Sequence, residues 1–204
     1  MKTSAYWLAS TLALCTIATS ALAAEDNHIQ KLVGKVCSAC HGSGGNSISP
    51  SFPKLAGQRA SYLVAQLTSF RDRTRSDKDA QDAMWGWSRS LSDQDIKDLA
   101  AYYEAQKPMS GIPMPEALVK RGQQVFENGL ASTNIPACAT CHGGNAEGKD
   151  NIPQLAGQHA AYLMKQLKVF RTAGLRPAAV AMHSIVAGLT DEDMEAVAAY
   201  LQSK

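Results

Sequence analysis

Two stretches of the sequence, CSACHGSGG at residues 37–45 and CATCHGGNA at residues 138–146, carry the same Cys-x-x-Cys-His pattern about one hundred residues apart. The chain has 204 residues and five cysteines, four of which belong to these two motifs. This length permits one medium domain or two small ones, and the repeated motif favours two.

The sequence that follows each motif is also repeated. FPKLAGQRASYLVAQLTSFR, from Phe52, matches IPQLAGQHAAYLMKQLKVFR, from Ile152. After a two-residue difference in loop length the alignment resumes, so that Met84 corresponds to Met182. The residues that recur one hundred positions on are Pro53, Leu55, Ala56, Gly57, Gln58, Ala60, Tyr62, Leu63, Gln66, Leu67, Phe70 and Arg71. The chain is therefore an internal duplication.

Helical periodicity dominates both copies. A capping-box pattern, Ser92 with Asp95 and Thr190 with Asp193, precedes the last segment of each copy. Behind it, apolar residues follow at i, i+3, i+4 and i+7, which predicts an amphipathic final helix in each copy. These apolar residues are Ile96, Leu99, Ala100 and Tyr103, and Met194, Val197, Ala198 and Leu201. No segment alternates with the period of a strand, so the predicted fold class is all-α.

The N-terminus has the features of an export signal. Lys2 supplies a positive charge, residues 7–17 form a short apolar run, and Ala21-Leu22-Ala23 matches a cleavage site. We expect residues 1–23 to be a cleaved signal peptide, with an uncleaved membrane anchor as the alternative. The mature protein is then expected in the periplasm, at most peripherally associated with a membrane.

The remaining sequence divides into two predicted domains. Residues 24–107 are expected to form the first and residues 116–204 the second, joined by a Pro-containing linker at residues 108–115. Each domain holds about ninety residues, a size at which a bound cofactor supports a thin hydrophobic core. The formal charge of +2 lacks the basic excess that is typical of nucleic-acid-binding proteins.

The chemistry of Cys-x-x-Cys-His points to covalent haem. Two thiols three residues apart fit one helical turn, where they can add to the two vinyl groups of a haem, and the adjacent histidine can reach the iron. A zinc site would need a second Cys or His pair in the same half, such as a second Cys-x-x-Cys, and neither half has one. A thioredoxin-like dithiol would need a βαβ context. We therefore predict haem attachment at Cys37 and Cys40 with His41 as iron ligand, and at Cys138 and Cys141 with His142.

For the first haem, elimination favours a methionine as the sixth iron ligand. No histidine lies between His41 and His142, so a second histidine ligand for the first haem would have to come from outside that segment. Met84 precedes the final helix and has an aligned partner in Met182, whereas the linker methionines have none. A thioether ligand favours ferrous iron and raises the haem potential, and a filled sixth position leaves no site for oxygen or peroxide.

These motifs resemble the dihaem cytochrome c4 family, in which two class I cytochrome c domains are fused in tandem. The resemblance rests on VCSACHG with FPKLAGQ, on IPACATCHG with IPQLAGQ, and on the segments that begin at Met84 and Met182. It implies two His/Met-ligated haem c groups, haem propionates near the domain interface, and proximal histidines that bond to the carbonyls of Pro53 and Pro153.

The resemblance also implies a function. The chain is expected to be a periplasmic electron carrier rather than an enzyme, with redox proteins as donor and acceptor and a membrane-bound terminal oxidase as the expected destination. A cytochrome subunit of a flavoprotein dehydrogenase, such as a sulfide dehydrogenase, is the alternative. A dihaem peroxidase and a module in which haem only supports the fold are the remaining hypotheses.

Several residues near the motifs have local interpretations. We expect Trp85 and Trp87 to serve packing rather than electron transfer or docking, and His159 and His183 to have surface or packing roles rather than to bind iron. In RDRTR, residues 71–75, only Arg71 recurs in the second copy, as Arg171. These two arginines are expected either to share a role near the haem propionates or to stabilise a helix C-terminus by their positive charge. Arg73 and Arg75 are expected to be solvated.

Overall fold

The computed structural model describes residues 28–204, and the predicted signal peptide lies outside them. Apart from two isolated β-bridges, the described residues contain helices and loops only. Within this range no helix is long and apolar enough to span a membrane. The first copy contains η1 (Leu32–Cys37), α2 (Ser38–His41), η2 (Ser43–Gly45), α3 (Ala60–Arg71), η3 (Ala80–Met84), α4 (Trp85–Ser88) and α5 (Asp93–Glu104). The second contains α6 (Glu116–Asn128), η4 (Ala131–Thr133), α7 (Ala139–His142), α8 (Ala160–Arg171), α9 (Val180–Val186) and α10 (Asp191–Ser203).

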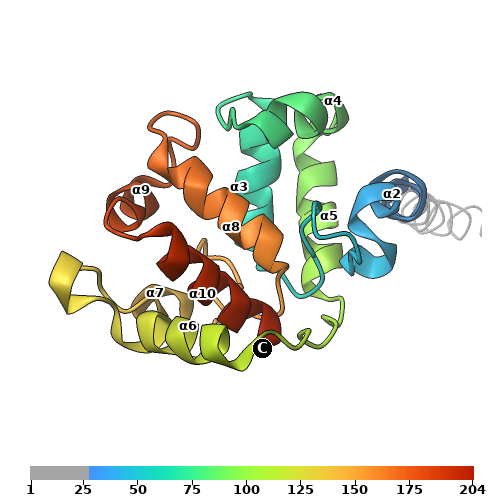
Figure 1. Ribbon diagram of the computed structural model, residues 1–204. Helices are drawn as coiled ribbons and strands as arrows, with labels where there is room; N and C mark the ends of the chain where they lie inside the picture. Colours follow the sequence, from blue (N-terminus) through green and yellow to red (C-terminus); the bar gives the residue numbers. More distant parts are fainter. Residues whose placement is uncertain (1–27) are drawn as a thin grey trace, which may run out of the picture.

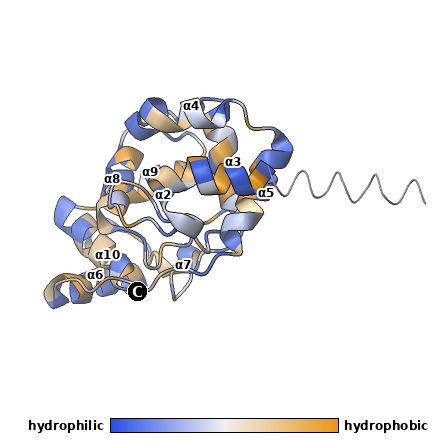
Figure 2. Ribbon diagram, turned by 90° about the vertical axis from the view of Figure 1, so that its right-hand side faces the viewer, coloured by the Kyte–Doolittle hydropathy of each residue, from blue (hydrophilic) through white to orange (hydrophobic). Residues whose placement is uncertain are grey.

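Each copy folds around its own hydrophobic core. In the first copy α3 packs against α5, and in the second α10 packs against α6 and α8 (Figure 1). Figure 2 shows that α3 and α5 carry both hydrophobic and hydrophilic residues, as expected for helices that cover a core on one face. The second core is the larger and is centred on Phe126, Val125 and Met194, which are nearly inaccessible to solvent.

The final helices confirm the capping prediction. The hydroxyl groups of Ser92 and Thr190 accept hydrogen bonds from the backbone N–H groups of Asp95 and Asp193, and each aspartate carboxylate bonds back to the cap residue. All eight apolar residues predicted on the inner faces of the two final helices are buried. Periodicity and capping residues therefore located both helices and the faces they bury.

Gly122 permits the closest helix contact in the second copy. It lies on α6 where this helix crosses α10, and a Cβ atom there would overlap the carbonyl oxygen of Ala196 and crowd Tyr200. Only a residue without a side chain allows the two backbones to approach so closely.

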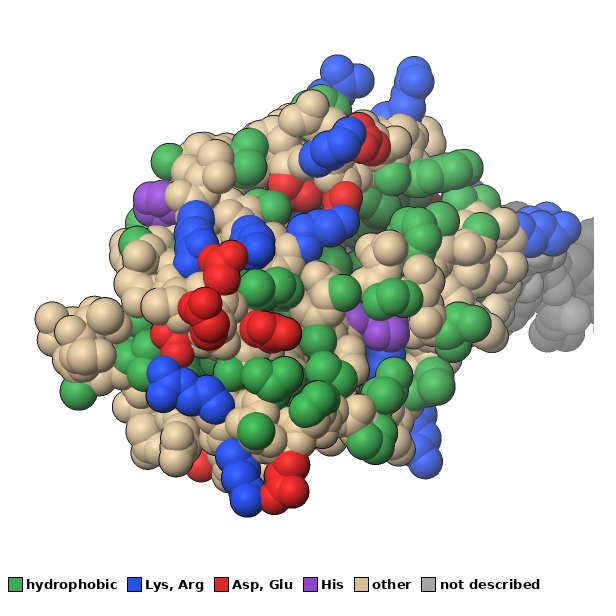
Figure 3. Space-filling view, in the orientation of Figure 1, with side chains coloured by type: hydrophobic (Ala, Val, Ile, Leu, Met, Phe, Trp, Pro, Cys, Tyr) green, Lys and Arg blue, Asp and Glu red, His purple; other side chains and the backbone are tan. Residues whose placement is uncertain are grey.

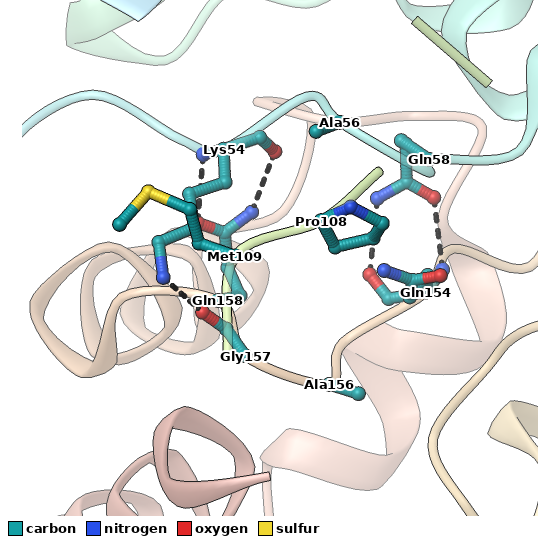
Figure 4. Close-up of a pocket in the computed structure, with 9 residues that line it drawn as sticks. All are labelled: Lys54, Ala56, Gln58, Pro108, Met109, Gln154, Ala156, Gly157 and Gln158. Carbon is teal, nitrogen blue, oxygen red and sulfur yellow. Dashed lines mark hydrogen bonds between the residues drawn. The ribbon is translucent and has the colours of Figure 1, made fainter. Parts of the chain in front are cut away.

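The two copies meet through a reciprocal pair of glutamines. The side-chain amide of Gln158 accepts from the backbone N–H of Lys54 and donates to its carbonyl, both at 2.9 Å. Gln58 bonds to the backbone of Gln154 in the same way, at 2.8 and 3.0 Å (Figure 4). Because Gln58 and Gln158, like Lys54 and Gln154, are equivalent in the repeat, the interface has approximate two-fold symmetry.

A second set of equivalent residues extends this interface. The Arg59 side chain donates to the carbonyl oxygens of Glu147 and Gly148, and His159, its counterpart, bonds through Nε2 to the carbonyl oxygen of Ser47 at 2.8 Å. His159 is only 2% exposed, so the expected surface or packing role is a buried contact between the copies.

The structure contradicts the expectation that Arg75 is solvated. It is 6% exposed rather than solvated, and its guanidinium group pairs with Asp77 at 2.7 Å. It also donates to Gln66 and to Gln166, and Arg176 of the second copy donates to the same two glutamines. The expectation was wrong because one of the three hydrogen-bond partners of the Arg75 guanidinium group, Gln166, belongs to the other copy.

Candidate functional site: the two Cys-x-x-Cys-His motifs

The first motif lies where η1 passes into α2. Cys37 ends η1, and Cys40 and His41 follow one turn later on α2, so both thiols and the imidazole belong to one short helical stretch. Gly42 ends this stretch with φ of 75°, a left-handed conformation that favours glycine. The second motif is built alike, with α7 ending at His142.

Both motif histidines are oriented by a proline carbonyl. His41 Nδ1 donates to the carbonyl oxygen of Pro53 at 2.9 Å, and His142 Nδ1 donates to that of Pro153 at 3.1 Å. A carbonyl oxygen can only accept, so the proton is on Nδ1 in both rings. This leaves Nε2 of each histidine as a lone-pair donor for a metal and confirms the proline contacts that the resemblance implied.

Burial adjusts the protonation of these groups. It lowers the pKa of His41 and of His142, an effect that the hydrogen bonds to the prolines partly oppose. Each imidazole is thereby favoured in the neutral form that binds iron. Burial also raises the pKa of the Cys37 and Cys138 thiols, so thiolate is disfavoured at both positions.

The donor set fits haem and does not fit the alternatives. None of the four motif cysteines is in a disulfide, so all four are available for covalent attachment through thioethers. Among residues 28–204 no group of three or more His, Cys, Asp or Glu side chains is arranged to hold a metal ion, which argues against a zinc site. Two thiols and one oriented imidazole in each copy match the requirements of a haem with one axial histidine.

The two predicted methionine ligands occupy equivalent helical segments. Met84 ends η3, and its carbonyl accepts from the Ser88 hydroxyl at 2.6 Å. Met182 lies on α9 and packs, half-buried, against the same core as Cys138. η3 and α4 pack against α3, and α9 packs against α8, so the segment that carries each methionine packs against the repeated central helix of its copy.

The side chains next to Met84 have defined partners. The Trp85 indole N–H donates to the carbonyl of Arg75 at 2.8 Å, which confirms a packing role, and the Arg73 guanidinium lies 5.4 Å from its ring centre. Trp87 is 61% exposed, so the expected packing role is wrong for this residue. In the second copy His183 is exposed and donates to the carbonyl of Phe170 at 2.7 Å.

The recurring arginines bind the turn before each final helix. Arg71 donates to the carbonyl of Leu91 and pairs with Asp93, and Arg171 donates to the carbonyl of Leu189 and pairs with Asp191. Their recurrence is thus explained by a structural contact in both copies. Ion pairs are also common elsewhere on the surface, and Figure 3 shows acidic and basic side chains intermixed on one face.

Sequence reasoning assigned no role to five interface residues, which are Lys54, Gln58, Gln158, Gln66 and Gln166. Recurrence was the available signal, because Gln58 and Gln66 both return one hundred positions later. What recurrence could not show is that the partners of each residue lie in the other copy.

Comparison with known proteins places the chain among cytochromes. The cytochrome c family model matches residues 28–106 and again residues 119–204. Cytochrome c4 of Azotobacter vinelandii is 40% identical over 176 residues, which cover 82% of this chain and 83% of that protein. A thiosulfate dehydrogenase electron acceptor of Thiomonas intermedia is 36% identical over 174 residues, covering 82% and 78%.

A solved structure shares the fold over the same range. The cytochrome c4 of Acidithiobacillus ferrooxidans matches with a TM-score of 0.77 and 38% sequence identity, covering 82% of this chain and 98% of that one. The repeated haem-attachment motif, the duplicated helical fold and these similarities lead to one assignment. The chain belongs to the dihaem cytochrome c4 family and is an electron carrier, not an enzyme, with two covalently bound haem c groups.

Proposed function

We propose that the protein carries single electrons between periplasmic redox partners through two haems, each with one histidine and one methionine ligand. Cys37 and Cys40 would attach the first haem and His41 and Met84 would bind its iron. In the second copy the attachment residues are Cys138 and Cys141, and the iron ligands are His142 and Met182. The observation that carries this assignment is the matched orientation of the two histidines, each with Nδ1 bonded to a proline carbonyl.

The ligand set suits outer-sphere electron transfer. When bound, the haem supplies the reversible Fe(III)/Fe(II) couple, and the thioether favours the reduced state. The protein contributes the orientation of the imidazole, through Pro53 and Pro153, and a buried environment that disfavours the charged imidazolium form. With a histidine and a methionine bound to each iron, the site would offer no open position to a substrate.

The chain organisation is part of the proposal. Residues 1–23 would direct export and be removed, leaving a domain at residues 24–107, a linker at 108–115 and a second domain at 116–204. Export would place the protein in the periplasm, an oxidising compartment in which attachment to haem would keep the motif cysteines out of disulfides.

The partners follow from the same chemistry. We take a redox protein as donor and a membrane-bound terminal oxidase as acceptor, with the flavoprotein dehydrogenase complex as the alternative. The similarity to a thiosulfate dehydrogenase electron acceptor supports an enzyme as the electron donor. Oxygen uptake by oxidase-containing membranes should increase when the reduced protein is added. An absence of stimulation would remove the oxidase from the proposal.

A spectroelectrochemical titration tests the ligand assignment. The wild-type protein should contain two covalent haems per chain, each low-spin and methionine-ligated when oxidised. Met84→Ala and Met182→Ala should each convert one haem to a lower-potential species with an altered spectrum. Met109→Ala is the matched control, because this methionine is a 47% exposed linker residue. An unchanged spectrum in either ligand variant would refute that ligand.

A further inference from the structure

Lys54 breaks the symmetry of the interface between the two copies. In the repeated segments PKLAGQ and PQLAGQ, at residues 53–58 and 153–158, this is the one position that differs, with lysine in the first copy and Gln154 in the second. Because Lys54 is cationic and Gln154 is neutral, only one of these two equivalent positions in the interface carries a positive charge.

The Lys54 side chain is buried and crosses to the other copy. It is 8% exposed, and its Nζ donates to the carbonyl oxygen of Gly157 at 2.7 Å (Figure 4). The Gln158 amide holds the Lys54 backbone from both sides. No carboxylate among residues 28–204 forms a salt bridge with this ammonium group, whereas most buried charges in proteins are paired.

Lys54 also links the two loops that hold the motif histidines. Its own peptide follows Pro53, whose carbonyl accepts from His41. The carbonyl it binds, that of Gly157, belongs to the loop that begins at Pro153, whose carbonyl accepts from His142. Lys54 therefore joins the two loops whose prolines orient the proximal histidines.

The surroundings of Lys54 contain a second titratable group, His159. Burial lowers the pKa of His159, its hydrogen bond to Ser47 opposes this shift, and the Lys54 charge lowers the pKa further. The imidazole is thereby kept neutral. The Lys54 charge therefore acts on a titratable neighbour in the other copy.

We propose that Lys54 is a redox-tuning residue shared by the two haems, whose buried positive charge raises both reduction potentials. Ferric haem carries one more positive charge than ferrous haem, so a nearby cation destabilises the oxidised state relative to the reduced one. A buried charge acts over a longer range than an exposed one, because water and salt screen it less. This inference rests on the proposed electron-transfer function, and it names a residue that raises the reduction potentials of the haems.

The test compares charge-changing and charge-conserving variants of the haem-loaded protein. In Lys54→Gln both midpoint potentials should fall by about 30 mV or more, which is about a threefold change in the ratio of reduced to oxidised haem at about 59 mV per tenfold. Lys54→Arg keeps the charge and should restore the wild-type potentials. Gln154→Lys adds the equivalent cation in the second copy and should raise both potentials.

Lys78→Gln is the surface control. Lys78 has an 85% exposed side chain paired with Asp82, so its removal should leave both potentials unchanged. A purely structural role for Lys54 predicts lower thermal stability in Lys54→Gln and Lys54→Arg without a charge-dependent shift, and that result would overturn the proposal. Unchanged potentials in Lys54→Gln, or a shift of one potential alone, would also overturn it. Failure of the proposed function would instead appear in the wild type, as a high-spin or redox-inactive haem.

Discussion

Removal of the Gln158 amide tests whether the reciprocal glutamines hold the two copies together. In Gln158→Ala the backbone N–H and carbonyl of Lys54 each lose a hydrogen bond of 2.9 Å, and the backbone N–H of His159 loses one of 3.0 Å. Gln158 is 6% exposed, so the groups left behind lie in a place that water reaches poorly.

The size of the effect follows from these losses. A buried polar group left without a partner costs about 1–3 kcal/mol. Two such groups on Lys54 set a range of about 2–6 kcal/mol, and the space left by the side chain admits some water. We therefore expect the free energy of unfolding to fall by about 2–4 kcal/mol. With a urea m-value of about 2 kcal/mol/M, the midpoint should move down by about 1–2 M.

Equilibrium urea unfolding of the oxidised holoprotein, followed by far-ultraviolet circular dichroism and haem absorbance, measures this change. Gln154→Ala is the matched control, because it shortens a glutamine in the same interface whose side chain forms no hydrogen bond within residues 28–204. Its midpoint should stay close to that of the wild type. If the two variants unfold at the same urea concentration, the glutamine amides do not stabilise the interface and the reasoning fails.

Three further predictions concern buried contacts. Burial opposes ionisation of the Asp193 carboxyl, but hydrogen bonds from Arg121 and Thr190 lower its pKa below the usual value. The stabilisation that this carboxylate provides is therefore present above the unfolded-state pKa and is lost as pH falls through the folded-state pKa. Asp193→Asn should flatten the acid side of a stability-against-pH curve measured by thermal unfolding. Gly122→Ala should destabilise the second copy by about 2 kcal/mol or more through overlap with the α10 backbone, seen as a lower urea midpoint, and an unchanged midpoint would contradict the close helix contact. Arg75→Met should cost about 3–5 kcal/mol because Asp77 is left buried without its cation, and restoration of stability by adding Asp77→Asn would identify that cause.

The helices and the haem-attachment residues could be predicted because their signals are local. Apolar spacing located α5 and α10, the capping pairs fixed their starts, and Cys-x-x-Cys-His concentrates attachment and ligation in five consecutive residues. Duplication doubled each of these signals, so that agreement between the copies supported each assignment.

The interface could not be predicted from local pattern. The contact between Lys54 and Gln158 joins residues 104 positions apart, and that between Arg75 and Gln166 joins residues 91 apart. Sequence spacing carries no information about such pairs. Arg75 is expected in solvent because only Arg71 of RDRTR recurs in the second copy, whereas tertiary structure buries Arg75.

Because the two copies belong to one chain, equivalent positions in their interface can be substituted independently. In a dimer of identical subunits, a substitution at one position of a two-fold contact is copied at the other, so any defect or benefit is counted twice. In a single chain that contains both halves, position 54 can mutate while position 154 stays as it is. The lysine facing Gly157 is an instance of such a one-sided change, at a site where symmetry would have placed two like charges across a buried contact. Covalent linkage thus makes available to this protein interface sequences that a symmetric pair of subunits could not adopt.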